Sequence, residues 1–80
     1  MEALDGNAIA GSLFEYFGTE MTTAVGTCAH CGARAQIGQL VAYVRAPGAV
    51  VRCRNCGNVV MVLVTIRKKL HVDSSAFRME

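Results

Sequence analysis

The sequence predicts a small metal-stabilised α+β domain, namely a zinc ribbon with a three- or four-stranded antiparallel sheet and one N-terminal helix. Two Cys-x-x-Cys-Gly motifs are separated by 21 residues. An amphipathic helical pattern precedes these motifs, and alternating or β-branched segments lie between and after them. A chain of 80 residues gives a core so small that a metal, disulfides or a partner subunit usually adds stability. We therefore predict a single domain over residues 1–80.

A helix is predicted over residues 4–18. Asp5 or Asn7 can act as its N-cap by accepting a hydrogen bond from the first backbone amides, and Gly18 lies where a left-handed glycine ends a helix. The apolar residues of this segment recur at spacings of three and four, so they share one face, which is expected to cover one side of the sheet. That face consists of Ile9, Leu13, Phe14 and Phe17.

The predicted zinc ribbon spans residues 26–73. Residues 39–45 alternate between two faces as a strand does, and residues 49–52 return as a second strand. The segment 46–48 between them has the sequence Ala-Pro-Gly. It predicts a turn, because proline fixes φ and glycine permits a positive φ.

The longest apolar run covers residues 59–66. Its β-branched content predicts the central strand of the sheet, buried on both faces. Residues 70–73 are expected to pair with it after a bend at 67–69. The run is far shorter than the roughly 20 residues of a membrane-spanning helix, and residues 1–5 lack the basic start of a signal peptide. We therefore expect no membrane contact and a cytoplasmic location.

Cys28, Cys31, Cys53 and Cys56 are the predicted ligands of one structural metal ion. Two residues between cysteines let one tight turn aim both sulfur atoms at the same ion, and the following glycine tolerates the left-handed backbone that closes the turn. Four thiolates leave no position for water or substrate, which is typical of structural metal sites. In a reducing cytoplasm, two close cysteine pairs favour a metal site over disulfides or a redox pair.

Zinc is the expected metal, and iron is the less favoured alternative. Tetrahedral sulfur suits both metals, and rubredoxins also hold iron with two Cys-x-x-Cys-Gly turns. Rubredoxins are typically acidic, rich in aromatic residues around the iron, and often carry proline inside a turn. The cysteine-containing segment here is basic, has no tryptophan and has no proline in either motif. A rubredoxin-like iron electron carrier is therefore a lesser alternative function.

Charge divides the chain in two. Residues 1–27 hold four acids and no base, whereas residues 28–72 hold seven bases and no acid. Four thiolates around one zinc ion bring the formal net charge of +2 to about zero, so the chain lacks the strongly basic character of most nucleic-acid-binding domains. The bases that could form a nucleic-acid or partner surface are Arg45, Arg52, Arg54, Arg67, Lys68 and Lys69.

These patterns predict a non-catalytic module that contacts another protein or a second copy of itself. Hydrophobic residues make up 52% of the chain, and apolar surface that the small core cannot bury marks protein contact sites. Nucleic-acid binding through the basic segment is the main alternative. No paired carboxylates, nucleophile–base set or phosphate-binding glycine loop is visible, so we expect neither catalysis nor a small-molecule substrate.

Residues 4–11, with the sequence Leu-Asp-Gly-Asn-Ala-Ile-Ala-Gly, are followed by the two cysteine motifs with the Ala-Pro-Gly turn between them. This arrangement resembles a family of small, uncharacterised bacterial zinc-ribbon proteins over nearly the whole chain. The cysteine motifs are common to zinc ribbons in general, and the Leu-Asp-Gly-Asn-Ala start is more specific to the family. No activity is established for that family. The resemblance therefore implies metal binding by the same four cysteines, while Asp5 and Asn7 are expected to cap the helix.

Overall fold

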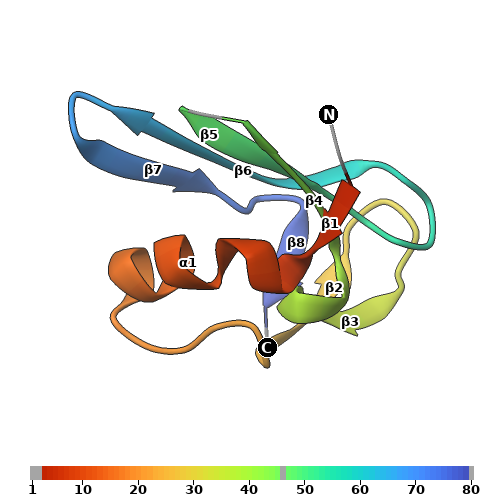
Figure 1. Ribbon diagram of the computed structural model, residues 1–80. Helices are drawn as coiled ribbons and strands as arrows, with labels where there is room; N and C mark the ends of the chain where they lie inside the picture. The colour runs from red at the N-terminus through yellow and green to blue at the C-terminus, as the bar shows by residue number, and fades with distance from the viewer. Residues whose placement is uncertain (1–2, 46, 80) are drawn as a thin grey trace.

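The computed structural model describes residues 3–45 and 47–79 (Figure 1). In chain order the elements are β1 (Ala3–Asp5), η1 (Gly6–Ile9), α1 (Ala10–Phe17), β2 (Val25–Cys28), β3 (Arg34–Gln36), η2 (Ile37–Gln39), β4 (Val41–Arg45), β5 (Gly48–Arg52), β6 (Val59–Ile66), β7 (Lys69–Asp73) and β8 (Phe77–Met79). Here η marks a short 3₁₀ helix. Neither the 3₁₀ segments nor α1 have the length and apolar character needed to cross a membrane.

The strands form two antiparallel sheets. The larger sheet has the order β1-β4-β5-β6-β7, and the smaller one has the order β3-β2-β8. In Figure 1 the larger sheet lies above α1, and the smaller sheet lies beside the end of the helical segment where the chain enters it. The predicted α+β class is therefore confirmed, although five strands pair in the larger sheet where three or four were expected.

Short strands outside the predicted set add the fifth strand of the larger sheet and build the smaller sheet. β1 pairs with β4, and β8, which lies after the predicted end of the ribbon at residue 73, pairs with β2. Phe77 of β8 is buried, and its ring lies so close to Gly26 that a Cβ there would come within 2.4 Å of it. Strands this short carry too few residues to show an alternating pattern, so their pairing follows from packing against distant parts of the chain.

The helical segment begins later than predicted, because residues 4 and 5 belong to β1. Asp5 is the N-cap of η1, and its carboxylate accepts a hydrogen bond from the Asn7 amide at 3.0 Å. Gly6 lies so close to η2 that a Cβ there would sit 1.8 Å from the Ile37 carbonyl oxygen. The prediction for Gly18 is confirmed: it has φ +75°, and its amide donates to the Phe14 carbonyl.

Only part of the predicted apolar helix face packs on the sheet. Ile9 and Leu13 are buried in the core, whereas Phe14 is 56% exposed and Phe17 is 36% exposed. Phe14 follows Leu13 by one residue, which rotates it by about 100° around a helix of 3.6 residues per turn. The prediction that all four side chains cover the sheet was therefore wrong for the two phenylalanines.

The strands predicted between residues 39 and 73 pair as expected. β4 pairs with β5, β5 with β6, and β6 with β7 after a two-residue turn at Arg67 and Lys68. Ala46, in the predicted turn between β4 and β5, lies outside the described residues. The central position of the sheet belongs to β5, because β1 adds a strand beyond β4.

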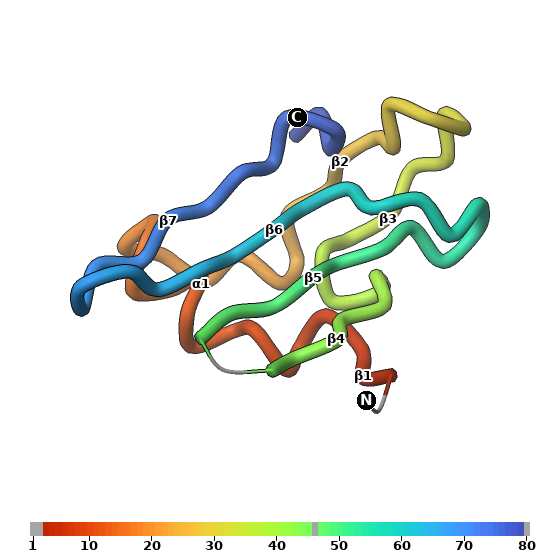
Figure 2. Tube along the Cα trace, turned by 90° about the horizontal axis from the view of Figure 1, so that it is seen from above, coloured from red at the N-terminus to blue at the C-terminus, as the bar shows by residue number. Residues whose placement is uncertain are grey.

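The strand β6 is not buried on both faces, as its composition predicted. Met61 and Leu63 point into the core, but Val62 is 38% exposed and Ile66 is 52% exposed. The helix covers one face of the larger sheet, and no described element covers the other face of β4, β5 and β6 (Figure 2). The sequence therefore correctly predicted a strand but overestimated its burial.

The close approach of Gly6 to η2 makes a testable prediction about stability. Gly6→Ala would force a methyl group onto the Ile37 carbonyl, and overpacking of this kind destabilises by about 1–3 kcal/mol. Gly11→Ala is the matched control, because a Cβ at Gly11 meets nothing within 4 Å and alanine is about 1 kcal/mol better than glycine inside a helix. Urea unfolding of the metal-loaded protein should show opposite signs for the two variants. Equal effects would contradict the packing of η1 on η2.

Candidate metal centre

Two backbone loops of the same geometry present the four cysteines. We call them the first knuckle (residues 28–33) and the second knuckle (residues 53–58). In each, the amide of the first cysteine donates to the carbonyl of the last residue at 2.9 Å, and the glycine amide donates back to the carbonyl of the first cysteine at 2.9 Å. Gly32 has φ +79° and Gly57 has φ +77°, a conformation that costs glycine little. The predicted left-handed glycines are therefore confirmed.

The four sulfur atoms gather at one point, with all of them within 4.8 Å of one another. The Sγ atoms of Cys28 and Cys56 are 3.8 Å apart, and those of Cys31 and Cys53 are 3.6 Å apart. A tetrahedral metal–thiolate site with bonds of about 2.3 Å has sulfur–sulfur edges of about 3.8 Å. The separations therefore fit one metal ion held by Cys28, Cys31, Cys53 and Cys56.

The two knuckles come from different sheets. The first knuckle connects β2 to β3 of the smaller sheet, and the second connects β5 to β6 of the larger sheet. Each of the two close sulfur pairs joins one cysteine from each knuckle. A metal ion bound here would therefore link the two sheets directly.

The cysteines alternate between buried and exposed positions. Cys28 and Cys53, the first cysteine of each knuckle, belong to the hydrophobic core, whereas Cys31 and Cys56 are exposed. The centre therefore lies at the edge of the core, with its inner ligands held by packing and its outer ligands held by the knuckle backbone.

Polar groups around the sulfur atoms stabilise negative charge there. The amide of His30 points at Cys28 Sγ at 3.4 Å, as expected for a knuckle. Sequence reasoning missed two side-chain donors of the second knuckle. Asn55 donates from Nδ2 to Sγ of Cys31 in the first knuckle at 3.5 Å. Asn58 donates from Nδ2 to Sγ of Cys56 in its own knuckle at 3.4 Å.

The signal for these two donors was present in the sequence. The second motif reads Cys-Arg-Asn-Cys-Gly-Asn, whereas the first reads Cys-Ala-His-Cys-Gly-Ala. Asparagine side chains are hydrogen-bond donors at positions where the first knuckle has histidine and alanine. Their direction toward sulfur, however, depends on how the two knuckles face each other.

The pKa values of the exposed thiols and of a buried thiol shift in opposite directions. The Asn55 side-chain amide is the main cause that lowers the pKa of Cys31 to about 6, and the Asn58 backbone amide is the main cause that lowers the pKa of Cys56. Burial raises the pKa of Cys53 to about 11. A coordinated metal cation deprotonates a thiol outright, so metal binding at neutral pH releases a proton from Cys53.

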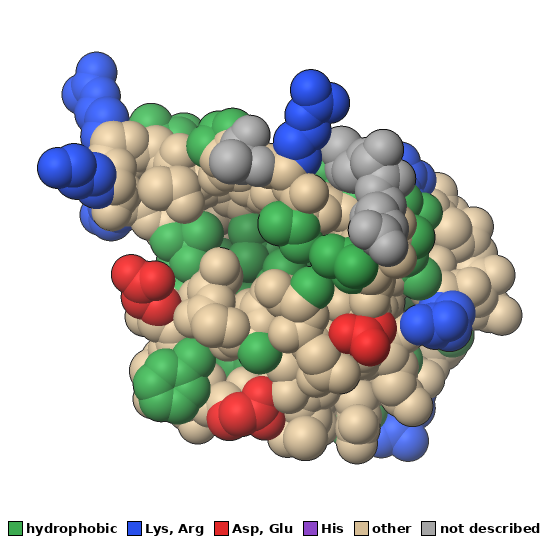
Figure 3. Space-filling model, in the orientation of Figure 1, with side chains coloured by type: hydrophobic (Ala, Val, Ile, Leu, Met, Phe, Trp, Pro, Cys, Tyr) green, Lys and Arg blue, Asp and Glu red, His purple; other side chains and the backbone are tan. Residues whose placement is uncertain are grey.

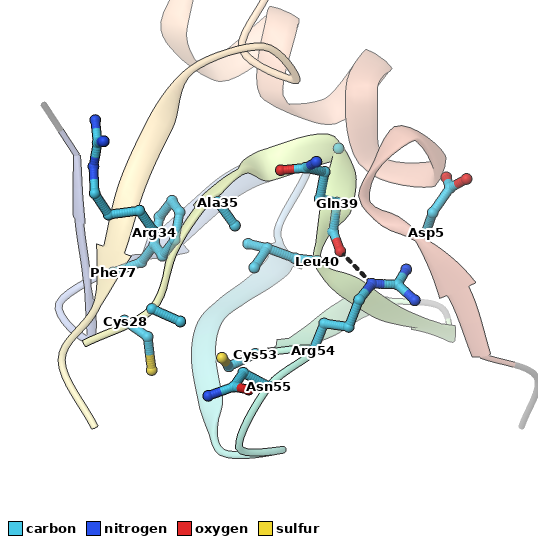
Figure 4. A pocket seen from close by; sticks show the side chains of 12 residues that line it. Asp5, Cys28, Arg34, Ala35, Gln39, Leu40, Cys53, Arg54, Asn55 and Phe77 are labelled. Atoms are coloured by element: carbon cyan, nitrogen blue, oxygen red, sulfur yellow. Dashed lines mark hydrogen bonds between the residues drawn. The ribbon is translucent and has the colours of Figure 1, made fainter. Parts of the chain in front are cut away.

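A groove of about 570 Å³ lies beside the metal centre (Figure 4). Cys28 and Cys53 line one end of it, and Leu40 and Phe77 line its apolar wall. Across the groove the guanidinium of Arg54 donates from Nε to the carbonyl oxygen of Gln39 at 2.8 Å. Arg54 therefore connects the second knuckle to η2.

The other predicted basic residues do not form one continuous cluster with Arg54. Arg52 donates to the Gly57 carbonyl at 2.8 Å, and its guanidinium carbon lies 6.0 Å from the centre of the Tyr43 ring. Arg45 ends β4, whereas Arg67, Lys68 and Lys69 occupy the turn between β6 and β7 and the start of β7. The bases thus divide between the knuckle, one face of the larger sheet and the tip of a hairpin.

Fold and site together define a small α+β domain with antiparallel sheets and a four-cysteine metal site. The chain belongs to DUF6510, a family of unknown function whose model matches residues 1–79. No curated protein and no solved structure matches the chain.

The Asn55 hydrogen bond predicts how the metal site responds to mutation and pH. Asn55→Ala should weaken metal binding by about 10-fold or more, because such supporting hydrogen bonds contribute about 10–100-fold to affinity. The variant also loses the group that lowers the pKa of Cys31, so protons should displace the metal at a higher pH than in the natural protein. Competition with a chromophoric chelator over a pH series measures both effects.

His30→Ala is the control for this experiment, because His30 contacts sulfur through its backbone amide and keeps that contact when the side chain is removed. Its metal affinity should stay within about twofold of the natural protein, well below the effect of a supporting side chain. Equal losses in the two variants would show that the Asn55 side chain does not support the centre.

Proposed function

We propose that this protein is a non-catalytic, zinc-stabilised ribbon module that binds another protein. The observation that carries the proposal is the complete set of four sulfur ligands at tetrahedral separations. Catalytic zinc sites keep a position for water or substrate, whereas four-cysteine sites are structural. The bound ion would hold the two sheets together and leave the surface free to contact a partner.

Zinc suits this centre better than iron on chemical grounds. Four thiolates bind both metals, so the ligand set alone does not choose between them. Phe14, Tyr16 and Phe17 are exposed residues of α1, Tyr43 lies on the larger sheet, and Phe77 is the one described aromatic residue that lines the groove beside the sulfur atoms. The scarcity of aromatic side chains around the sulfur atoms favours a structural zinc ion over an electron-transfer iron. A reducing cytoplasmic location, which stays a prediction, would keep the thiols available for it.

Exposed apolar side chains support the binding of a protein partner. Figure 3 shows hydrophobic side chains gathered in a hollow between the hairpins of the larger sheet and the helical segment. A pocket between the helical segment and these hairpins is lined by Ile9, Leu63 and Val44, and Val44 is 44% exposed. Apolar patches of this kind on a small protein mark interaction sites. The large hydrophobic residues with high exposure are Leu4, Phe14, Tyr16, Phe17, Val44, Val62 and Ile66.

Nucleic-acid binding is a second candidate function, and the β6–β7 hairpin favours it. Three bases follow one another at its tip, and Arg67 (φ +53°) and Lys68 (φ +65°) both have positive φ. The residues preferred at the two positions of such a turn are asparagine and glycine, not arginine and lysine. The side chains of Arg67, Lys68 and Lys69 hold no hydrogen bond or ion pair within the described residues, so they are available to phosphates.

Metal analysis and chelation test the zinc assignment. Native mass spectrometry of the purified protein should show one zinc ion per chain and a colourless sample. Removal of the metal with a strong chelator should unfold the domain, because binding free energy at a structural zinc site is also folding free energy. A red, iron-containing protein, or one that keeps its circular-dichroism spectrum after complete chelation, would contradict the proposal.

A double substitution at the hairpin tip tests the second candidate. Arg67→Asn with Lys68→Gly should stabilise the protein by about 1 kcal/mol or more, because both new residues adopt positive φ more readily. Thermal unfolding measures this gain. If the tip binds nucleic acid, the same variant should lose affinity for a DNA or RNA duplex and show a weaker dependence on salt. Unchanged retention on nucleic acid would eliminate this candidate.

A further inference from the structure

The outward face of strands β4, β5 and β6 is apolar at its centre. Tyr43 of β4 lies opposite Val50 of β5, and Val50 lies opposite Val62 of β6, so these three side chains form a row across the sheet. Val41 and Val64 stand on the same face in the neighbouring rows. We call these five residues the outer face. Val62 is 38% exposed and the other four are partly buried.

The composition of the outer face differs from that of a solvated sheet face. An antiparallel sheet with one face in water usually alternates between apolar and polar residues. β6 instead carries an apolar residue at three successive positions on this side, namely Val62, Val64 and Ile66. Within residues 3–45 and 47–79 nothing packs over this face, and Figure 2 looks onto it with α1 on the far side of the sheet. A sheet face of this composition is stable when another element covers it.

The outer face is hollowed as well as apolar. Two adjoining hollows share Tyr43 and Val50 as lining residues. One of them is also lined by Arg52 and Gly57. Arg52 is held there in advance, because it donates to the Gly57 carbonyl at 2.8 Å and lies 6.0 Å from the Tyr43 ring centre. A partner side chain can therefore enter without first ordering this arginine.

The rim of the outer face is mainly basic. Arg45, Arg52 and Lys69 stand on the same side of the sheet as the apolar row. Two acids, Asp5 and Asp73, also stand on this side, and each accepts a hydrogen bond from a backbone amide at 3.0 Å, so three bases stand against two acids there. An apolar centre with a basic rim is complementary to a surface that combines apolar and acidic side chains.

Resting on the proposed function, we propose that the outer face binds an acidic amphipathic helix of a partner protein. The opposite face of the same sheet is already covered by a helical segment through Ile9 and Leu13. A partner helix would complete a three-layer arrangement, with its apolar residues on the valines and its acids on the arginines. A strand would instead need a sheet edge to pair with.

Self-association through this face is disfavoured by charge and by geometry. Two outer faces packed on each other would bring two basic rims together. The chain's own apolar and acidic surface, at Phe14 and Glu15 on α1, lies on the other side of the sheet. Helix-to-sheet contacts between copies would therefore form an open chain rather than a closed dimer.

Nucleic acid is disfavoured because the centre of the face is aliphatic. Single-stranded binding surfaces rely on several aromatic side chains for base stacking, and the outer face offers only Tyr43. Valine side chains at its centre provide no contact for phosphates. The basic rim therefore fits carboxylates around an apolar helix better than a phosphate backbone.

Binding of synthetic peptides to the zinc-loaded protein tests this proposal. Three probes are compared: a Leu/Glu amphipathic helix of about 18 residues, a Leu/Lys helix of the same length and pattern, and a single-stranded oligonucleotide. Fluorescence anisotropy measures affinity, and amide chemical-shift changes locate the binding surface. We expect binding of the Leu/Glu helix, with shifts on β4, β5 and β6, and binding at least tenfold weaker for the Leu/Lys helix.

Variants with matched charge changes separate this surface from others. Val62→Glu, at a partly exposed position, should reduce affinity for the Leu/Glu helix at least tenfold while the amide spectrum stays folded, and Arg45→Glu should reduce both the affinity and its salt dependence. Phe14→Glu, on the exposed side of α1, is the control and should bind as the natural protein does.

Three results would overturn the proposal: no binding of the Leu/Glu helix, equal binding of the Leu/Lys helix, or sensitivity to Phe14→Glu but not to Val62→Glu. The third result rejects this surface and leaves the proposed protein-binding module intact. Binding of the oligonucleotide alone would reject both the surface and the proposed function.

Discussion

The meeting of four sulfur atoms from two separate sheets is the constraint on which the rest of the structure depends. β2 and β3 share no strand pairing with the larger sheet, and η2 joins β3 to β4 along the chain, so a metal held by the knuckles would add a second connection between the two sheets. Without a cation, a cluster of thiols 3.6–3.8 Å apart offers only weak hydrogen bonds between sulfurs. With a bound cation, the four thiolates would form coordination bonds that link the two knuckles next to a small core. The buried positions of Cys28 and Cys53 make that link part of the core itself.

The N-terminal segment also stabilises this arrangement, through its contacts with η2. Asp5 caps η1, Gly6 allows η1 to touch η2, and a Cβ at Gly38 would lie 3.0 Å from the Asn7 side-chain oxygen. These contacts give the Leu-Asp-Gly-Asn-Ala start a structural explanation, since they fix η2, which leads directly into β4. Arg54 reaches the same turn through the carbonyl of Gln39. The N-terminal segment and the second knuckle therefore both hold η2 in place, and through it the start of β4.

The division of charge along the chain becomes a division of surface in the folded molecule. Glu15 of the acidic segment lies on α1, but Asp5 lies beside the outer face, and the basic segment supplies the knuckles, the hairpin tip and most of the rim of that face. With a divalent metal bound, four thiolates would compensate the formal positive charge, and this polarity would be local rather than global. In the proposed complex, such a local charge pattern would orient a partner of opposite pattern without general attraction of anions to the whole protein. An apolar centre within such a rim has the organisation of a protein interface.

The sequence by itself determined the features that depend on neighbouring residues. The four ligands, the left-handed glycines after them, the end of the helix at Gly18 and the hairpins from β4 to β7 all follow from short-range spacing. Only the tertiary structure decided which surfaces are covered. Phe14 and Val62 are apolar, as buried residues usually are. They are buried only if another element packs over them, and no local sequence pattern shows whether one does. The pairing of β1 and β8, and the reach of Asn55 across to Cys31, likewise depend on contacts between distant segments, because such contacts form only when the whole chain is folded.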